Sequence, residues 1–392
     1  MIVTGLCLAC LCGMAGFAVD VGVLFRDKRI VQTAADAGAI AGAAEYHYTD
    51  VTAAARAATA LNGVTNGSGG ATVTVNSPPL SGPHLGVAGY VEVIVTVAEP
   101  TFFMKALKFS TMNVSARSVA GLGPATGCIF TLDPSGIDIG MTGSGDLNMP
   151  SCGIVINSAS SNALNLTGSA TISAQSIGIV GGYHETGSGT ITPTPVTGVA
   201  PVANPLAYLT APTFTPASCL ADPHYTGSTS HTIGPSVAGG TICYNGLSMT
   251  GSGSLTLNPG IYVINGALSM TGSGSLSGSG ITIYLAPPNG SLSLTGSGAL
   301  TVSAPTSGTY DGILFFEDSA DTNAMTVTGS GSSVVQGIFY APSASLSMTG
   351  SSGSSFNADL VVNALTMTGS GNMSNYATVN STDPITSARV VE

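Results

Sequence analysis

The residues best suited to chemistry are three carboxylates in the last third of the chain. Glu317, Asp318 and Asp321 directly follow the apolar stretch ILFF. Two carboxylates about 5–9.5 Å apart could hydrolyse a glycosidic bond, and carboxylates combined with loop carbonyls could bind Ca²⁺. A solvated acidic loop would explain the same residues without any chemistry. We predict such a loop, with a weak Ca²⁺ site as the first alternative and polysaccharide hydrolysis as the second.

Other reactive patterns are missing from the sequence. The five histidines show no metal-ligand spacing, and no Ser–His–Asp or phosphate-binding motif occurs. We therefore predict a non-enzymatic protein without a cofactor. Residues 118–388 contain eleven acids and no Lys or Arg. Binding to nucleic acid depends on Lys and Arg neutralising phosphates, so nucleic acid is excluded as a partner. The same stretch cannot act as a polysaccharide lyase that uses Arg or Lys as its base, because it contains neither residue.

The seven cysteines form two groups. Cys7, Cys10 and Cys12 lie in the apolar N-terminus, and four more lie in the Gly-rich part. The second group consists of Cys128, Cys152, Cys219 and Cys243. Four cysteines allow three pairings, and the equal spacing within the two successive pairs favours Cys128–Cys152 and Cys219–Cys243. Disulfides would indicate an oxidising compartment; four buried thiols are the alternative.

A repeated phrase organises the larger part of the chain. SMTGSGSL occurs twice, and TG phrases recur from residue 142 to residue 368 at separations of roughly 19–25 residues. Short β-like segments lie between them, which predicts a right-handed parallel β-helix over residues 124–392 with about 20–25 residues per coil. We take the longest gap, from Thr186 to Thr226, as two coils, and the gap from Thr295 to Thr328 as one coil with an insertion. Gly would form stacked corners, and outward Ser and Thr could form a ridge that binds neutral glycans.

The N-terminus is predicted to be a long helix over residues 1–62. Ile2–Phe25 is apolar with one charge, Asp20, and is long enough for a transmembrane helix. No basic residue precedes the run, so a cleaved signal peptide fits less well. Asp20 is expected either to reach toward the membrane surface or to pair with a neighbouring subunit. Residues 63–123 alternate as strands do, which predicts a small α/β module.

The first 45 residues resemble the TadG-like proteins of the Tad (Flp) pilus system. The resemblance rests on an apolar helix with Gly, Asp and Gly, followed by a Gln and an Ala-Ala-Asp-Ala stretch. The matching residues are Gly16, Asp20, Gly22, Gln32, Ala34, Ala35, Asp36 and Ala37. This resemblance implies helix packing and assembly through Gly16, Asp20, Gly22, Gln32, Ala35 and Asp36.

The rest of the chain is similar to the Gly-rich extracytoplasmic region of TadG-like proteins. The similarity is carried by segments such as GCIFTLDPSG at residues 127–136 and NPGIYVINGALSM at residues 258–270. It implies a structural subunit or accessory of a Tad-type pilus, which associates with itself or other pilus subunits through the N-terminal helix. The implied location is the bacterial cell envelope, anchored in the inner membrane and extracytoplasmic, or an extracellular filament. An adhesin for neutral glycans is the alternative.

Overall fold

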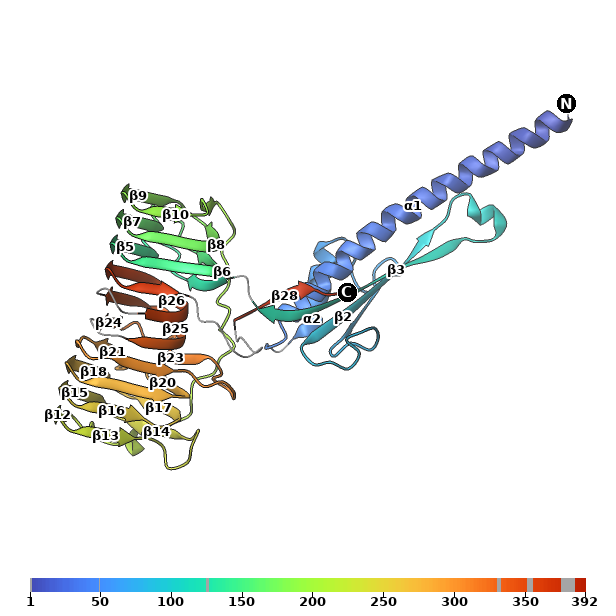
Figure 1. Cartoon of the computed structure of the whole chain (residues 1–392). Helices are drawn as coiled ribbons and strands as arrows, with labels where there is room; N and C mark the ends of the chain where they lie inside the picture. Colours follow the sequence, from blue (N-terminus) through green and yellow to red (C-terminus); the bar gives the residue numbers. More distant parts are fainter. Residues whose placement is uncertain (1, 49, 125–126, 330–332, 351–354, 375–384) are drawn as a thin grey trace. The chain divides into compact units, whose positions relative to one another are not determined.

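The computed structural model describes residues 2–48, 50–124, 127–329, 333–350, 355–374 and 385–392. The chain forms two compact units (Figure 1). Unit 1 comprises Met1–Gly123 and Thr386–Glu392, and unit 2 comprises Pro124–Ile385. The division after residue 123 coincides with a predicted boundary, whereas residues 62 and 63 lie within one unit. The N-terminal helix and the small module share one core, and the last seven residues belong with them instead of with the β-helix.

Unit 1 is a long helix and a short helix packed on a four-stranded sheet. The expected single helix is divided into α1 (Ile2–Ala44) and α2 (Val51–Leu61), because the Asp50 side chain accepts the Ala53 N–H and begins a new helix. The sheet has the order β1-β2-β3-β28. Its strands are β1 (Thr72–Asn76), β2 (Tyr90–Pro100), β3 (Thr111–Pro124) and β28 (Thr386–Val390), and the 3₁₀ helix η1 (Met104–Leu107) lies between β2 and β3.

Small residues bring α1 close to α2 and the sheet. Ala35 and Ala39 are fully buried, as is Val93 of β2. A Cβ added at Gly38 would lie 2.7 Å from Thr59 Cγ2, and one added at Gly42 would lie 2.9 Å from Val91 Cγ1. The Ala and Gly residues of this part of α1 thus serve close packing within unit 1.

Unit 2 is a parallel β-solenoid of about ten turns with three faces. The first face carries the TG phrases and contains β12 (Tyr225–Gly227), β15 (Leu247–Gly251), β18 (Ala267–Gly272), β21 (Ser291–Leu294), β24 (Met325–Gly329), β5 (Ile139–Gly143), β7 (Leu164–Gly168) and β9 (Tyr183–Gly187). The second contains β13 (Ser230–Ile233), β16 (Ser254–Leu257), β19 (Ser275–Ser279), β22 (Leu300–Ser303), β27 (Asn372–Ser374) and β10 (Thr190–Thr192). The third contains β14 (Thr241–Tyr244), β17 (Gly260–Ile264), β20 (Ile281–Leu285), β23 (Ile313–Glu317), β4 (Gly127–Thr131) and β11 (Val196–Thr197). Four longer strands contribute to more than one face: β25 (Val334–Gly350), β26 (Ser355–Gly369), β6 (Asp146–Ile156) and β8 (Thr171–Ile179).

The repeated phrases stack on one another in register. Ser248 pairs with Ser269 and Met249 with Met270, so identical residues of β15 and β18 lie side by side. The Leu and Met side chains point inward, and Met249 is only 3% exposed. Gly272 at the corner has a φ of +99°, and a Cβ there would lie 2.5 Å from the carbonyl oxygen of the preceding corner. The phrase therefore requires glycine both for its backbone conformation and for the close approach of neighbouring coils.

The order of coils along the stack differs from their order in the sequence. β5, β7 and β9 stack in one direction, and the coils from β12 to β26 stack on the other side of β5 (Figure 1). One coil in the middle combines distant segments: β26 and β27 form two of its faces, and β4 forms the third. The chain thus begins and ends the solenoid within a single coil.

The longest gap between two TG phrases is not two coils, which corrects the sequence-based interpretation. The segment between β11 and β12 contains only η2 (Pro216–Ser218) and one isolated bridge, and it leads from β9 at one end of the stack to β12 at the other (Figure 1). Leu206 of this segment is fully buried against outward side chains of the third face, including Tyr284 and Tyr340. We call residues 202–214 the strap. The gap that follows Thr295 is one coil with insertions, as predicted.

Candidate functional site

The most specific polar arrangement on the N-terminal helix is built around Asp20. Its side chain is 2% exposed. One carboxylate oxygen accepts the Phe102 N–H at 2.9 Å, and the other accepts the N–H groups of Phe103 at 2.9 Å and Met104 at 2.6 Å. These donors lie where the chain turns between β2 and β3. Asp20 therefore neither reaches for a membrane surface nor needs a neighbouring subunit for its hydrogen bonds.

Gly16 lies one helical turn before Asp20 and receives an aromatic ring. A Cβ at Gly16 would lie 2.7 Å from ring atoms of Phe103, so only glycine lets the ring pack on the helix. Gly22 differs, because nothing lies within 4 Å of the position of an added Cβ. Of the Gly, Asp, Gly signature, the first two residues thus hold the β2–β3 connection against α1. The third is not required by any neighbour within the described residues.

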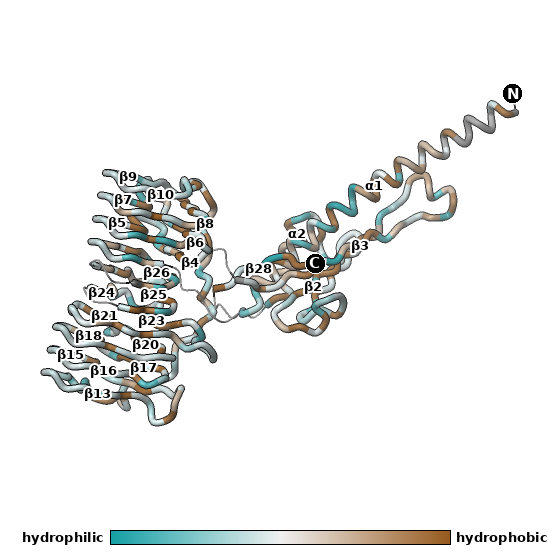
Figure 2. The backbone as a smooth tube through the Cα atoms, in the orientation of Figure 1, coloured by the Kyte–Doolittle hydropathy of each residue, from teal (hydrophilic) through white to brown (hydrophobic). Residues whose placement is uncertain are grey.

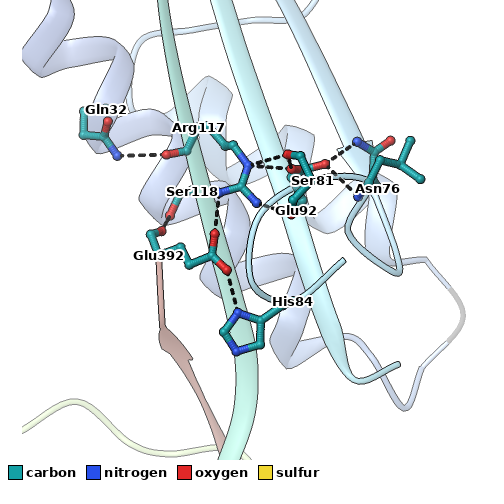
Figure 3. A network of polar contacts seen from close by, with 9 residues as sticks. Gln32, Asn76, Ser81, His84, Glu92, Arg117, Ser118 and Glu392 are labelled. Atoms are coloured by element: carbon teal, nitrogen blue, oxygen red, sulfur yellow. Dashed lines mark hydrogen bonds and ion pairs between the residues drawn. The ribbon is translucent and has the colours of Figure 1, made fainter. Parts of the chain in front are cut away.

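Gln32 and Asp36 join α1 to the sheet of unit 1. Gln32 Nε2 donates to Asp36 Oδ1 at 2.8 Å and to the Arg117 carbonyl at 3.4 Å. Figure 3 shows that this contact borders a larger network, in which Arg117 binds two carboxylates. Its Nε lies 2.5 Å from Glu92 Oε1, and its Nη1 lies 2.6 Å from Glu392 Oε2.

The network fixes the C-terminal residue to the sheet and sets the ionisation of Glu92. Burial by itself would raise the pKa of Glu92, but hydrogen bonds from Ser81, Asn76, Arg117 and the Leu80 N–H outweigh it and lower the pKa to about 2. Glu92 is thus a carboxylate at neutral pH. Sequence analysis missed this network because its members lie far apart in the chain.

The β2–β3 connection carries a group of exposed apolar side chains. We call residues 101–110 the hairpin tip (Figure 2). Phe102 is 66% exposed and Leu107 is 70% exposed, although both are large and apolar. The neighbouring N-terminal half of α1 also exposes apolar side chains, including Leu11, Met14, Phe17 and Val19. The 3₁₀ helix η1 lies within this connection, at the end of the hairpin.

The transmembrane prediction concerns the first part of α1. Among the helices that the structure describes, no stretch is both long and apolar enough to cross a bilayer.

The acidic residues after ILFF are not a solvated loop, which corrects the sequence-based prediction. Glu317 is fully buried and Asp321 is 2% exposed. Neither oxygen of Glu317 has a hydrogen-bond partner among the residues that the structure describes. Burial, together with the nearby charge of Asp321, raises the pKa of Glu317 to about 8. The carboxyl group is therefore mostly protonated at neutral pH. Glu317 ends β23 on the third face, whose outer side the strap and a loop containing Tyr310 cover.

The three acids do not converge on one point. Asp318 Oδ2 accepts a hydrogen bond from the Tyr284 hydroxyl at 2.8 Å, and Asp321 Oδ1 accepts from the Asn323 backbone and side chain. Among the described residues, one group offers three candidate metal ligands within 4.8 Å of one another, namely Cys128, Cys152 and Asp359. Its two sulfur atoms are already joined to each other.

Both predicted disulfides are present, so the alternative of four buried thiols does not hold. Cys128–Cys152 has a Cα–Cα distance of 5.7 Å and links β4 to β6 in neighbouring coils. Cys219–Cys243 has a Cα–Cα distance of 4.6 Å and links the segment that follows the strap to β14. Each bond thus fastens a place where the order of coils departs from the order of the sequence.

A second buried carboxyl group lies beside the first disulfide-linked coil. Asp138 is fully buried, and its Oδ2 accepts from Thr131 Oγ1 at 2.9 Å and from the Ser158 N–H at 3.0 Å. Burial is the largest influence on Asp138 and raises its pKa to about 7. Sequence analysis did not select this residue, because a lone Asp before a strand carries no signal of burial.

Comparison with known proteins identifies the N-terminal segment. No curated protein and no solved structure matches the chain. Residues 1–45 match the family model described as "Putative Flp pilus-assembly TadE/G-like". The match covers the whole of α1, including Gly16, Asp20, Gln32 and Asp36. The chain therefore has a TadE/G-like pilus-assembly domain at its N-terminus, and together with the β-solenoid this confirms the resemblance to TadG-like proteins.

Proposed function

We propose that this chain is a non-enzymatic structural component of a Tad-type pilus or a related surface assembly. The observation that carries the proposal is the match of residues 1–45 to a TadE/G-like pilus-assembly domain. The matched residues form α1, whose N-terminal half exposes large apolar side chains such as Leu11 and Phe17. Such a surface calls for a covering partner or lipid. In this proposal α1 associates with the envelope membrane or with other pilus subunits, and the solenoid is the extracytoplasmic part.

The role can be tested in cells that make the native protein. An antibody against the solenoid is used to label cells and sheared surface material for negative-stain microscopy. Label along fibres supports a filament subunit. Label confined to the cell envelope supports an anchored accessory and removes the filament. Label found only in the cytoplasm contradicts the proposal as a whole.

A second candidate is an adhesin that binds neutral glycans through the first face of the solenoid. The observation that favours it is a column of threonines paired in register in two runs of coils, with a break between Thr271 and Thr328. Its members are Thr226, Thr250, Thr271, Thr328, Thr349, Thr368, Thr142, Thr167 and Thr186. Hits on a glycan array that disappear in Thr349→Val, Thr368→Val but persist in the second-face control Thr301→Val would support the adhesin. An array without hits removes it.

The remaining alternative is a polysaccharide hydrolase that uses the acids after β23. We propose that these residues are structural. The burial of Glu317 and the hydrogen bond between Asp318 and Tyr284 support a packing role. A Glu317→Gln, Asp318→Asn variant should therefore show the same polysaccharide turnover as the natural chain. Turnover by the natural chain that the variant loses would contradict this.

A further inference from the structure

We propose that the hairpin tip, residues 101–110, is a contact with an anionic lipid surface, separate from the apolar helix that carries the pilus-assembly signature. This inference rests on the proposed envelope location of the chain. It assigns a lipid-binding role to the β2–β3 connection, which lies outside the matched residues 1–45.

The distribution of phenylalanine sets the tip apart from the rest of the chain. The sequence contains eleven phenylalanines. Five of them are exposed, and all five lie on α1 or the hairpin tip: Phe17, Phe25, Phe102, Phe103 and Phe109. The six in the solenoid are buried or half-buried. A chain that exposes none of the six phenylalanines of its solenoid but exposes three within eight residues of the tip presents these three to something other than water.

The tip is held in place. Asp20 binds three of its backbone amides, Thr101 N donates to the Ser110 carbonyl at 3.1 Å, and Thr101 Oγ1 donates to the Phe109 carbonyl. Lys108 ends η1 in the left-handed conformation with a φ of +71°. These contacts fix the exposed rings on a defined turn beside the apolar helix. They also supply donors to an aspartate that would otherwise be costly next to lipid.

The charge of the hairpin tip indicates what kind of surface the tip binds. Lys105 and Lys108 are its charged residues, and it contains no acid, whereas the whole chain has a net charge of −11. The eleven acids of residues 118–388 account for this net charge, because the other eight acids of the chain equal its eight Lys and Arg residues. The tip is therefore a positive site on a unit without net charge. Phenylalanine and leucine next to lysines are typical of segments that lie at a membrane interface, and lysines are attracted to an anionic lipid surface. The composition of the tip therefore fits an anionic bilayer surface.

The sequence allows a direct test, because the chain contains no tryptophan. Phe102→Trp places a single fluorophore in the tip, and Leu61→Trp places one at the 89% exposed end of α2 as a matched control. The full chain is mixed with phosphatidylcholine–phosphatidylglycerol vesicles with and without brominated acyl chains. We expect the emission of the Phe102→Trp variant to shift to the blue and to lose most of its intensity with brominated lipid, while the Leu61→Trp control stays unchanged.

The lysines are tested in the Phe102→Trp background. Lys105→Gln with Lys108→Gln should remove the dependence of quenching on phosphatidylglycerol content, whereas Arg56→Gln on α2 should not. A chain that floats with vesicles but shows no quenching in the tip overturns the tip contact and leaves the proposed envelope function intact. Blue-shifted emission without quenching would mean that protein covers the tip, which also overturns the lipid contact. A chain that does not float at all contradicts both proposals.

Discussion

The two units of the molecule are stabilised by different chemistry. Unit 1 contains all eight basic residues of the chain and relies on contacts that occur once, such as Asp20 with its three amides and Arg117 with its two carboxylates. Unit 2 contains no basic residue and repeats one solution, a glycine corner with stacked Leu or Met, along its whole length. Repetition removes the need for ion pairs, because each coil gives its neighbour backbone hydrogen bonds and an identical apolar surface.

The largest effect that separates the units should come from loss of the disulfides, which lie in unit 2. Each bond joins cysteines 24 residues apart, and a loop of that length contributes about 3–4 kcal/mol through the unfolded state. We expect Cys128→Ala, Cys152→Ala to increase hydrogen exchange in peptides of the solenoid and leave peptides of unit 1 unchanged. The Cys219→Ala, Cys243→Ala pair serves as the matched variant. Equal loss of protection in unit 1 would show that the units do not fold independently.

A smaller difference should separate corner glycines from turn glycines. Gly272→Ala combines a left-handed backbone with a close contact to the carbonyl of Gly251, for an expected cost of about 2–4 kcal/mol. Gly86→Ala in unit 1 has a φ of +71° but nothing within 4 Å, so about 1 kcal/mol is expected. Urea unfolding followed by circular dichroism measures both. Similar values for the two variants would contradict the role of stacking.

The two units should also respond to pH in opposite directions. The pKa of Glu317 is raised from 4.5 to about 8, so the native solenoid keeps a proton that the unfolded chain releases. Its stability should therefore fall as pH rises from 4.5 to 8, because the unfolded chain loses the proton over this range and the native solenoid keeps it. The pKa of Glu92 is lowered to about 2, so unit 1 should lose stability only as pH falls from 4.5 to 2.

Urea unfolding between about pH 3 and pH 9 tests this contrast. Glu317→Gln should flatten the dependence above pH 4.5, whereas the surface control Glu185→Gln should leave it unchanged. Asp138, whose pKa is raised to about 7, adds to the loss of solenoid stability with rising pH. Asp138→Asn should remove its contribution to this pH dependence. An unaltered slope in both buried-site variants would show that these carboxyl groups are hydrated in the native state.

The smallest effect is expected at Asp20, because it is local. Asp20→Ala leaves three amides of the hairpin tip without an acceptor. We expect the free energy of local opening of the tip to fall by about 1–3 kcal/mol. Hydrogen exchange of residues 101–110 should become faster, with little change in the solenoid. Asp20→Asn keeps an acceptor oxygen and should have an intermediate effect. Unchanged exchange in both variants would show that the tip does not depend on this carboxylate.

The repeats allowed the solenoid and its period to be predicted, and the equal cysteine spacing allowed its disulfides to be predicted, but neither shows the order of the coils. MTGSG at residues 141–145 and MTGSG at residues 367–371 are the same phrase, so the sequence cannot show that these two coils are neighbours. Right-handed coiling stays a prediction. The prediction of two coils between Thr186 and Thr226 was wrong for a related reason. A strap over the third face needs a chain of similar length to two coils, so the length of the gap does not distinguish them.

The candidate site was only half visible in the sequence. Asp20 was evident as a single charge in an apolar run, but its partners are backbone amides, which carry no residue signature. Glu317 was placed in solvent because an acid after an apolar strand normally ends it. In this fold both sides of the third face are covered, the inner side by the core and the outer side by the strap, so burial extends to the end of β23.

The coil shared by β4, β26 and β27 has a consequence for how the protein is made. During synthesis the N-terminal part of a chain is produced first. The coils from β4 to β10 are therefore made before β26, the strand that pairs with β5. Until residues 364–374 arrive, those coils present an open strand edge that could pair with another chain. Residues 364–374 cover this edge, and β28, which follows them in the chain, joins the sheet of unit 1. A chain that stops before residue 364 therefore lacks a strand in the sheet of each unit, and neither unit is complete until these residues have been made.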